Sequence, residues 1–87
     1  MLIRYFAAAR AAAGSSEETR ALTGRTSLAG LLTELAGAND KLADVIPACS
    51  YLLNGTAVAP RVASDAAQSP LVGDSDTLDV LPPFAGG

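Results

Sequence analysis

A strand-like run close to the C-terminus, Thr77–Leu81, leads without a turn into the tail Pro82-Pro83-Phe84-Ala85-Gly86-Gly87. Its alternating residues predict that the last core element of the fold is a strand. Two glycines are poorly suited to an ordered end, because each loses more backbone entropy on ordering than any other residue and neither has a side chain to pack. A narrow, extended tail can instead enter the active site of another protein. We therefore expect the reactive group of this chain to be the α-carboxylate of Gly87.

The length of 87 residues fits one small domain with a single core. We assign residues 1–81 to this domain and residues 82–87 to the extended tail. The net charge is −3, and all six basic residues precede Val62, whereas the rest of the chain contains four aspartates and no Lys or Arg. This distribution argues against a nucleic-acid partner. It favours a partner with a basic docking surface, unless the aspartates serve only in turns and solubility.

The chain contains one cysteine, Cys49, and no histidine. The usual Cys-His and Ser-His nucleophile pairs, His-based zinc sites and an internal disulfide are therefore excluded. We expect no metal, no cofactor and no catalysis by the chain alone, and we interpret Cys49 as a small buried residue. The apolar start is interrupted by Arg4 and Arg10, which leaves it too short for a signal peptide, and no run has membrane-spanning length. These features predict a cytoplasmic protein without a membrane partner.

The first part of the chain predicts two strands around a short helical turn. Residues 2–7 favour a strand with Ile3 and Tyr5 on one face, and the apolar character of both faces suggests a central place in a sheet. Residues 8–13 are strongly helix-forming and are followed by a glycine that can end the helix. Residues 17–22 predict a polar second strand.

Four leucines with the spacing i, i+3, i+4 and i+7 follow Ser27, namely Leu28, Leu31, Leu32 and Leu35. This spacing predicts an amphipathic helix that Thr26 or Ser27 caps and that ends at Gly37. Burial of each leucine contributes roughly 1.5–3 kcal/mol before the entropy cost. We expect this segment to be the main core helix.

A hairpin is predicted where Asn54-Gly55 separates the strand-like residues 50–53 and 56–58. Asn-Gly favours a type I′ turn because that turn needs positive φ at both central positions. The remaining predictions are a helix over residues 41–46 with Asp40 as its cap and Pro47 as its end, an irregular stretch over residues 59–70, and a turn over residues 73–76.

The predicted order is strand, strand, main helix, strand, short strand and final strand. If the first two strands form a hairpin and the helix packs across one face, the final strand can lie parallel beside the first. This order describes a ubiquitin-like β-grasp, an α+β fold with a mixed sheet packed on one main helix.

Three stretches also carry a resemblance: residues Ile3–Gly14, the hairpin Leu53–Thr56, and residues Pro70–Gly87. They resemble the MoaD family, the small subunits of molybdopterin synthase, which are relatives of the thiamine sulfur carrier ThiS and of ubiquitin. The last stretch is the most specific. A Pro-Pro pair followed by an apolar residue, a small residue and Gly-Gly is more typical of the molybdopterin branch than of the thiamine branch.

The resemblance implies a sulfur carrier that acts with two enzymes. A ubiquitin-activating-like adenylyltransferase (MoeB-like) would adenylate the Gly87 carboxylate, and sulfur would then replace AMP to leave a thiocarboxylate. The loaded tail would enter the large subunit of molybdopterin synthase and give its sulfur to a pyranopterin precursor. ATP and Mg²⁺ would belong to the activating enzyme. Related carriers in thiamine and cysteine biosynthesis remain an alternative.

The composition of the tail suits this role. A polyproline II exit at Pro82-Pro83 advances about 3.1 Å per residue, so residues 82–87 can reach roughly 19 Å. The expected partner-binding residues are Pro82, Pro83, Phe84, Ala85 and Gly86, and Phe84 is expected to anchor in a groove of the partner unless it folds back onto the sheet edge. Two further alternatives are a modifier that is joined to lysines through its C-terminus and a β-grasp interaction module whose Gly-Gly is only a frayed end.

Overall fold

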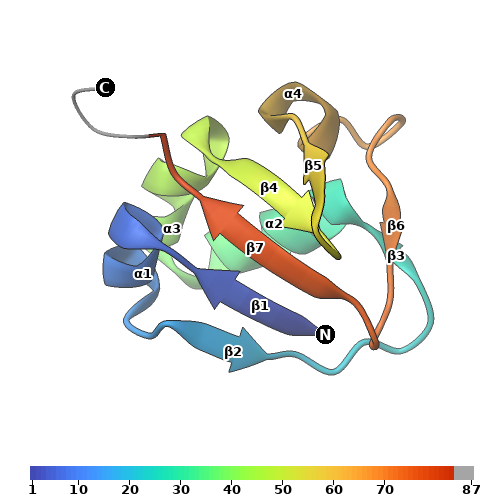
Figure 1. The fold of residues 1–87 in the computed structure, drawn as a ribbon, viewed down its shortest axis with the longest axis horizontal. Coiled ribbons are helices and arrows are strands. Elements are labelled where there is room, and N and C mark those ends of the chain that lie inside the picture. Colours follow the sequence, from blue (N-terminus) through green and yellow to red (C-terminus); the bar gives the residue numbers. More distant parts are fainter. Residues whose placement is uncertain (84–87) are drawn as a thin grey trace.

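Five strands form one mixed sheet in the computed structural model, which describes residues 1–83 (Figure 1). Their spatial order is β2-β1-β7-β4-β5. The bounds are β1 Leu2–Tyr5, β2 Glu17–Thr19, β4 Ser50–Leu53, β5 Thr56–Val58 and β7 Thr77–Leu81. The last strand thus occupies the middle of the sheet, with the first strand as its neighbour.

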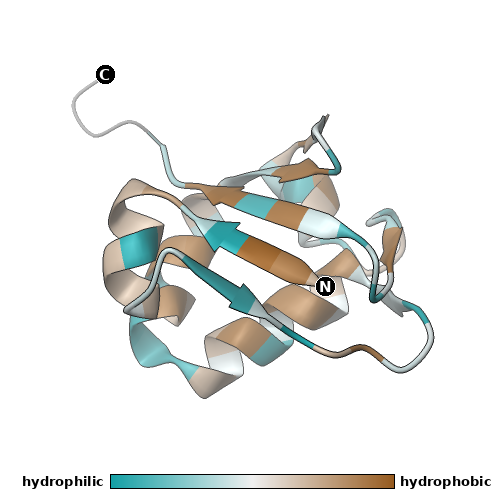
Figure 2. Cartoon of the chain, turned by 60° about the horizontal axis from the view of Figure 1, so that its bottom comes forward, coloured by the Kyte–Doolittle hydropathy of each residue, from teal (hydrophilic) through white to brown (hydrophobic). Residues whose placement is uncertain are grey.

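Strand β7 is hydrogen-bonded on both sides. It runs parallel to β1, with Tyr5 opposite Val80, and antiparallel to β4, with Ser50 opposite Leu81. Leu78 and Val80 are fully buried, and hydrophobic and hydrophilic residues alternate along the strand in Figure 2. The predicted final strand and its parallel pairing with the first strand are therefore confirmed.

Helix α2, Leu28–Ala38, covers one face of the sheet and lies behind it in Figure 1. All four leucines of the predicted stripe are buried. The Ser27 hydroxyl accepts a hydrogen bond from the Gly30 N–H at 3.0 Å, so Ser27 is the cap and Thr26 is not. The mixed sheet packed on this helix confirms the ubiquitin-like β-grasp.

The first strand is shorter than predicted because the chain turns into helix α1, Ala7–Ala13, immediately after Phe6. Phe6 is the N-cap of this helix, and Ala7 has a positive φ of 49°. As predicted, the glycine after residue 13 ends the helix: Gly14 has a φ of 81° and donates its N–H to the Arg10 carbonyl. The predicted hairpin turn is also confirmed, since Asn54 and Gly55 both have positive φ.

Short elements account for further predictions that were wrong. The second strand ends at Thr19 rather than residue 22, and helix α4, Pro60–Ala63, interrupts the stretch that showed no regular pattern. Proline favours the first turn of a helix, but four residues are too few to display a helical period. Strands β3, Thr26–Ser27, and β6, Leu71–Val72, pair with each other. Each has only two residues, so neither shows an alternating pattern in the sequence.

The second short helix is α3, Asp40–Val45, and a 3₁₀ turn η1, Ile46–Ala48, follows it. Its cap is Asn39, whose side-chain oxygen accepts from Lys41 N at 2.9 Å and Leu42 N at 3.2 Å. The prediction of Asp40 as the cap is therefore wrong by one residue.

Candidate functional site at the C-terminal end of the sheet

The tail begins where β7 leaves the sheet. Leu81 is the last strand residue, Pro82 is half-buried and Pro83 is exposed. The other predicted site residues, Phe84, Ala85, Gly86 and Gly87, lie outside the described residues. The structure therefore describes the base of the tail, which lies at the end of the central strand.

Main-chain hydrogen bonds hold this base on both sides. The N–H of Phe6 donates to the Val80 carbonyl at 3.2 Å and extends the β1–β7 pairing by one step. On the other side, Ser50 of β4 lies opposite Leu81. Because β7 pairs with β1 as far as Val80 and with β4 as far as Leu81, the starting point of the tail is fixed relative to the core.

A mainly apolar hollow of about 390 Å³ lies beside the tail base. It is lined by Phe6, Ala7, Ala8, Ser50, Leu81, Pro82 and Pro83. Phe6 is 41% exposed, whereas most large apolar side chains of residues 1–83 are buried or half-buried. The sequence predicted Phe6 only as a strand residue, so its place beside the tail was missed. An aromatic residue on the outer face of a predicted strand was the available signal.

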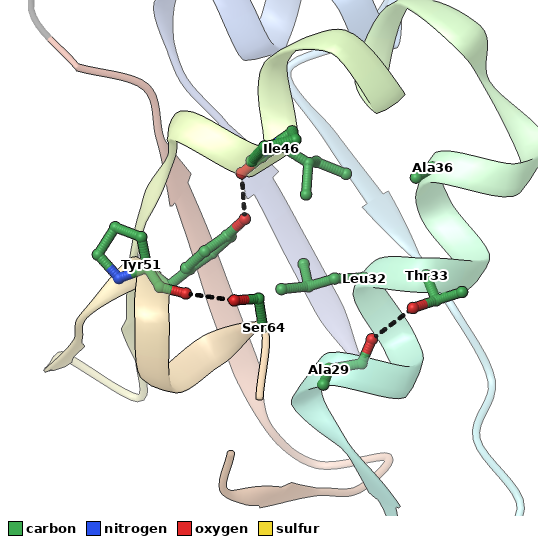
Figure 3. A pocket seen from close by; sticks show the side chains of 9 residues that line it. Ala29, Leu32, Thr33, Ala36, Ile46, Tyr51 and Ser64 are labelled. Carbon is green, nitrogen blue, oxygen red and sulfur yellow. Dashed lines mark hydrogen bonds between the residues drawn. The ribbon is translucent and has the colours of Figure 1, made fainter. Parts of the chain in front are cut away.

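A second hollow, of about 240 Å³, lies on the helical side between α2, η1, β4 and α4 (Figure 3). Three hydroxyl groups line it, but each one donates to a backbone carbonyl at 3.0 Å. The pairs are Tyr51 with Ile46, Thr33 with Ala29, and Ser64 with Pro60. These hydroxyls stabilise local backbone, and the arrangement resembles no acid–base or nucleophile constellation.

The four aspartates of the acidic C-terminal part all accept hydrogen bonds within the chain. Asp79 accepts two from the Arg4 guanidinium, at 2.6 and 3.0 Å, on the open face of the sheet. This hydrogen bond, with the attraction between the charges, raises the pKa of Arg4. Asp65 accepts from the Ala67 N–H at 2.8 Å.

The other two aspartates organise the turn before β7. Asp74 accepts from the Leu22 N–H at 3.0 Å, and this bond, assisted by the N-terminal ammonium group, lowers the pKa of Asp74. Asp76 accepts from the Asn54 side chain at 2.9 Å and from the Gly73 N–H at 2.7 Å. The structure thus favours the interpretation of these aspartates as turn residues over a docking role.

Cys49 is fully buried and donates its thiol hydrogen to the Val45 carbonyl at 3.2 Å. Burial raises the pKa of this thiol to about 11. The interpretation of Cys49 as a buried filler is confirmed, because both burial and the raised pKa suppress the reactive thiolate.

Two kinds of feature are absent from residues 1–83. In that range, no group of three or more Cys, Asp or Glu side chains is arranged to hold a metal ion. Likewise, no helix in the described part of the chain has the length and apolar character needed to cross a membrane.

Comparison with known proteins identifies relatives of nearly the same length. A molybdopterin synthase sulfur carrier subunit from Chlamydomonas reinhardtii is 29% identical over 85 residues, which are 98% of this chain and 95% of the relative. The solution structure of small archaeal modifier protein 1 from Methanosarcina acetivorans is 26% identical, with a TM-score of 0.73 over 99% of this chain and 94% of that one.

A structure from Pyrococcus furiosus, described as subunit 1 of a molybdopterin converting factor, shares the fold at 22% identity, with a TM-score of 0.74 over 95% of each chain. The model of the ThiS family matches residues 3–87, from the first strand to the last glycine. The chain therefore belongs to the ThiS family.

Proposed function

We propose that this protein is a sulfur carrier and the small subunit of a molybdopterin synthase. The observation that carries the proposal is the position of β7, the central strand, whose end passes directly into Pro82-Pro83 and the Gly-Gly terminus. Such an arrangement allows residues 1–81 to act as a rigid domain that is held by a partner while residues 82–87 enter the partner's active site. In the proposed reaction, the Gly87 carboxylate supplies the acyl group that is activated.

The chemistry requires activation from outside. A carboxylate is a poor acyl donor, so a MoeB-like adenylyltransferase joins it to AMP from ATP, with release of pyrophosphate. A sulfur nucleophile then displaces AMP and leaves a thiocarboxylate. The described residues fit this division of labour, because the single thiol is buried at Cys49 and is no substitute for an external sulfur donor.

The relatives and the composition of the tail support a pyranopterin precursor as the sulfur acceptor. The 29% identical relative is a molybdopterin synthase sulfur carrier subunit, and the double proline also favours the molybdopterin branch. In the proposed reaction the large subunit binds Pro82, Pro83, Phe84, Ala85 and Gly86, and the thiocarboxylate transfers its sulfur to the pyranopterin precursor. We propose that this reaction takes place in the cytoplasm, with neither nucleic acid nor a membrane as a partner.

Conjugation to other proteins is the second candidate. The 26% identity with small archaeal modifier protein 1 favours it over a plain interaction module with an inert terminus. Both functions begin with adenylation of Gly87, but a modifier ends as an isopeptide on a lysine, whereas a carrier cycles between acid and thioacid.

Intact-mass measurement tests the proposal. The protein is incubated with a MoeB-like adenylyltransferase, ATP, Mg²⁺ and a sulfur donor, and the expected mass gain equals the replacement of one oxygen by one sulfur. Deletion of Gly87 should abolish this gain. Gly37→Ala is the matched control, because a Cβ at this exposed helical position meets nothing within 4 Å. Normal loading of the Gly87 deletion would refute the proposal.

The pathway is tested with the loaded protein. Mixed with a molybdopterin synthase large subunit and the pyranopterin precursor, it should yield molybdopterin. If the loaded protein is inert there but supplies sulfur to a thiazole or cysteine synthase, the assignment to molybdopterin is wrong and the carrier function alone stands.

A further inference from the structure

The chain is almost free of nucleophilic amines. It contains one lysine, Lys41, beside five arginines. A guanidinium group remains protonated in proteins and does not accept acyl groups, whereas an unprotonated lysine amine is a nucleophile. Amide formation with an activated carboxylate is therefore confined to Lys41 and to the α-amino group of Met1.

The α-amino group of Met1 is engaged. It donates to the Arg20 carbonyl at 2.7 Å and lies 3.4 Å from a carboxylate oxygen of Asp74. The Met1 side chain belongs to the core and is only 3% exposed. Attack by this amine would require it to lose its hydrogen bond and its ion pair, and would pull the Met1 side chain out of the core.

Lys41 is in the opposite situation. It lies exposed in the first turn of α3, and its side chain makes no ion pair or hydrogen bond with the other residues of the range 1–83. Its backbone is held firmly, because the Asn39 cap accepts from the Lys41 N–H at 2.9 Å and also donates to the Ala12 carbonyl at 3.0 Å. The amine therefore projects from an anchored helix and is available to a second molecule.

We propose that Lys41 is the position at which one copy of this protein is joined to the C-terminus of another. The proposal rests on the adenylation of Gly87 proposed above, and it is independent of the sulfur step. The Lys41 nitrogen attacks the Gly87 acyl carbon, a C–N bond forms, and the bond from the acyl carbon to the AMP oxygen breaks. AMP leaves with the electron pair, and the amine releases a proton to solvent. The first product is an isopeptide-linked dimer, which keeps one free Lys41 and one free Gly87 carboxylate and can be extended through the same type of linkage.

The experiment uses the full chain with a MoeB-like adenylyltransferase, ATP and Mg²⁺, without a sulfur donor, so that the adenylate is available to amines. Pyrophosphate exchange reports adenylation, and a parallel reaction with a small primary amine shows that the acyl group can be captured. The expected product has the mass of two chains less one water, and peptide mapping should locate the linkage at Lys41 only. Lys41→Arg, which keeps the charge and the helix propensity, should reduce the dimer to the level seen without ATP.

Three results would overturn the inference. A linkage at the Met1 α-amino group would show that the hydrogen-bonded amine is the acceptor. Pyrophosphate exchange and capture by the small amine without a dimer would refute the role of Lys41 while the proposed function stands. Absence of pyrophosphate exchange would refute the proposed function and this inference together.

Discussion

Ala7 is held in a backbone conformation that favours glycine. Its φ of 49° lies in the left-handed region, where an L-residue pays roughly 1–2 kcal/mol. Glycine avoids this cost, but it raises the conformational entropy of the unfolded chain, which lowers the free energy of unfolding by about 0.4–1 kcal/mol. Because the Ala7 side chain is exposed, little packing is lost. Ala7→Gly is therefore expected to stabilise the protein by roughly 0.5–1 kcal/mol, which raises Tm by roughly 2–8 °C for a domain of this size.

Two glycines provide controls of opposite sign. A Cβ meets nothing within 4 Å at either Gly55 or Gly37, but Gly55 has a φ of 84° whereas Gly37 lies within helix α2. Gly55→Ala should destabilise the protein by roughly 0.5–1 kcal/mol, and Gly37→Ala should stabilise it by about the same amount. The assay is urea unfolding followed by far-UV circular dichroism, with an unchanged m-value as the sign that the unfolded state is comparable. If Ala7→Gly lowers Tm while both controls behave as expected, the conformational reasoning at Ala7 is refuted.

Three further predictions concern the thiol, the turn and the tail. The Cys49 thiol is buried and has a pKa of about 11, so at pH 8 its reaction with a thiol reagent should be limited by the rate of the local or global unfolding that exposes it. Rapid labelling of the native protein would contradict its burial. Hydrogen bonds from the Asn54 side chain and then from the Gly73 N–H lower the pKa of Asp76 below its ordinary value of 3.8. The stability that this carboxylate contributes is therefore complete above pH 3.8 and is lost as the pH falls through the lower pKa of the folded state. Asp76→Asn should reduce this loss of stability in acid unfolding curves, and a variant with the same pH profile as the original protein would contradict the prediction. Phe84→Ala should weaken binding to the large subunit by more than about 1 kcal/mol in calorimetry with little change in Tm, whereas a large fall in Tm with unchanged affinity would make Phe84 a core residue.

Regular, local patterns in the sequence were sufficient for the main elements. The leucine spacing from Leu28 to Leu35 specifies a helical face whatever surrounds it, and Asn54-Gly55 supplies the positive φ values that a tight hairpin turn requires. The alternation in Thr77–Leu81 likewise gives the last strand with its observed bounds. The Gly-Gly terminus and its proposed chemistry also come from the sequence, since residues 84–87 lie outside the described part of the chain.

Contacts between distant residues decided the rest. Asn39 rather than Asp40 caps α3, and the Asn39 side chain also reaches the Ala12 carbonyl, a contact that no local pattern announces. Strands β3 and β6 are too short to have a period and exist only because tertiary packing brings them together. The parallel pairing of β1 with β7 then places Phe6 beside Pro82, and so forms the hollow at the tail base. The sequence therefore determined which segments are helix, strand and tail, whereas the tertiary structure decided which side chains surround the tail, because that depends on strand register across more than seventy residues of chain.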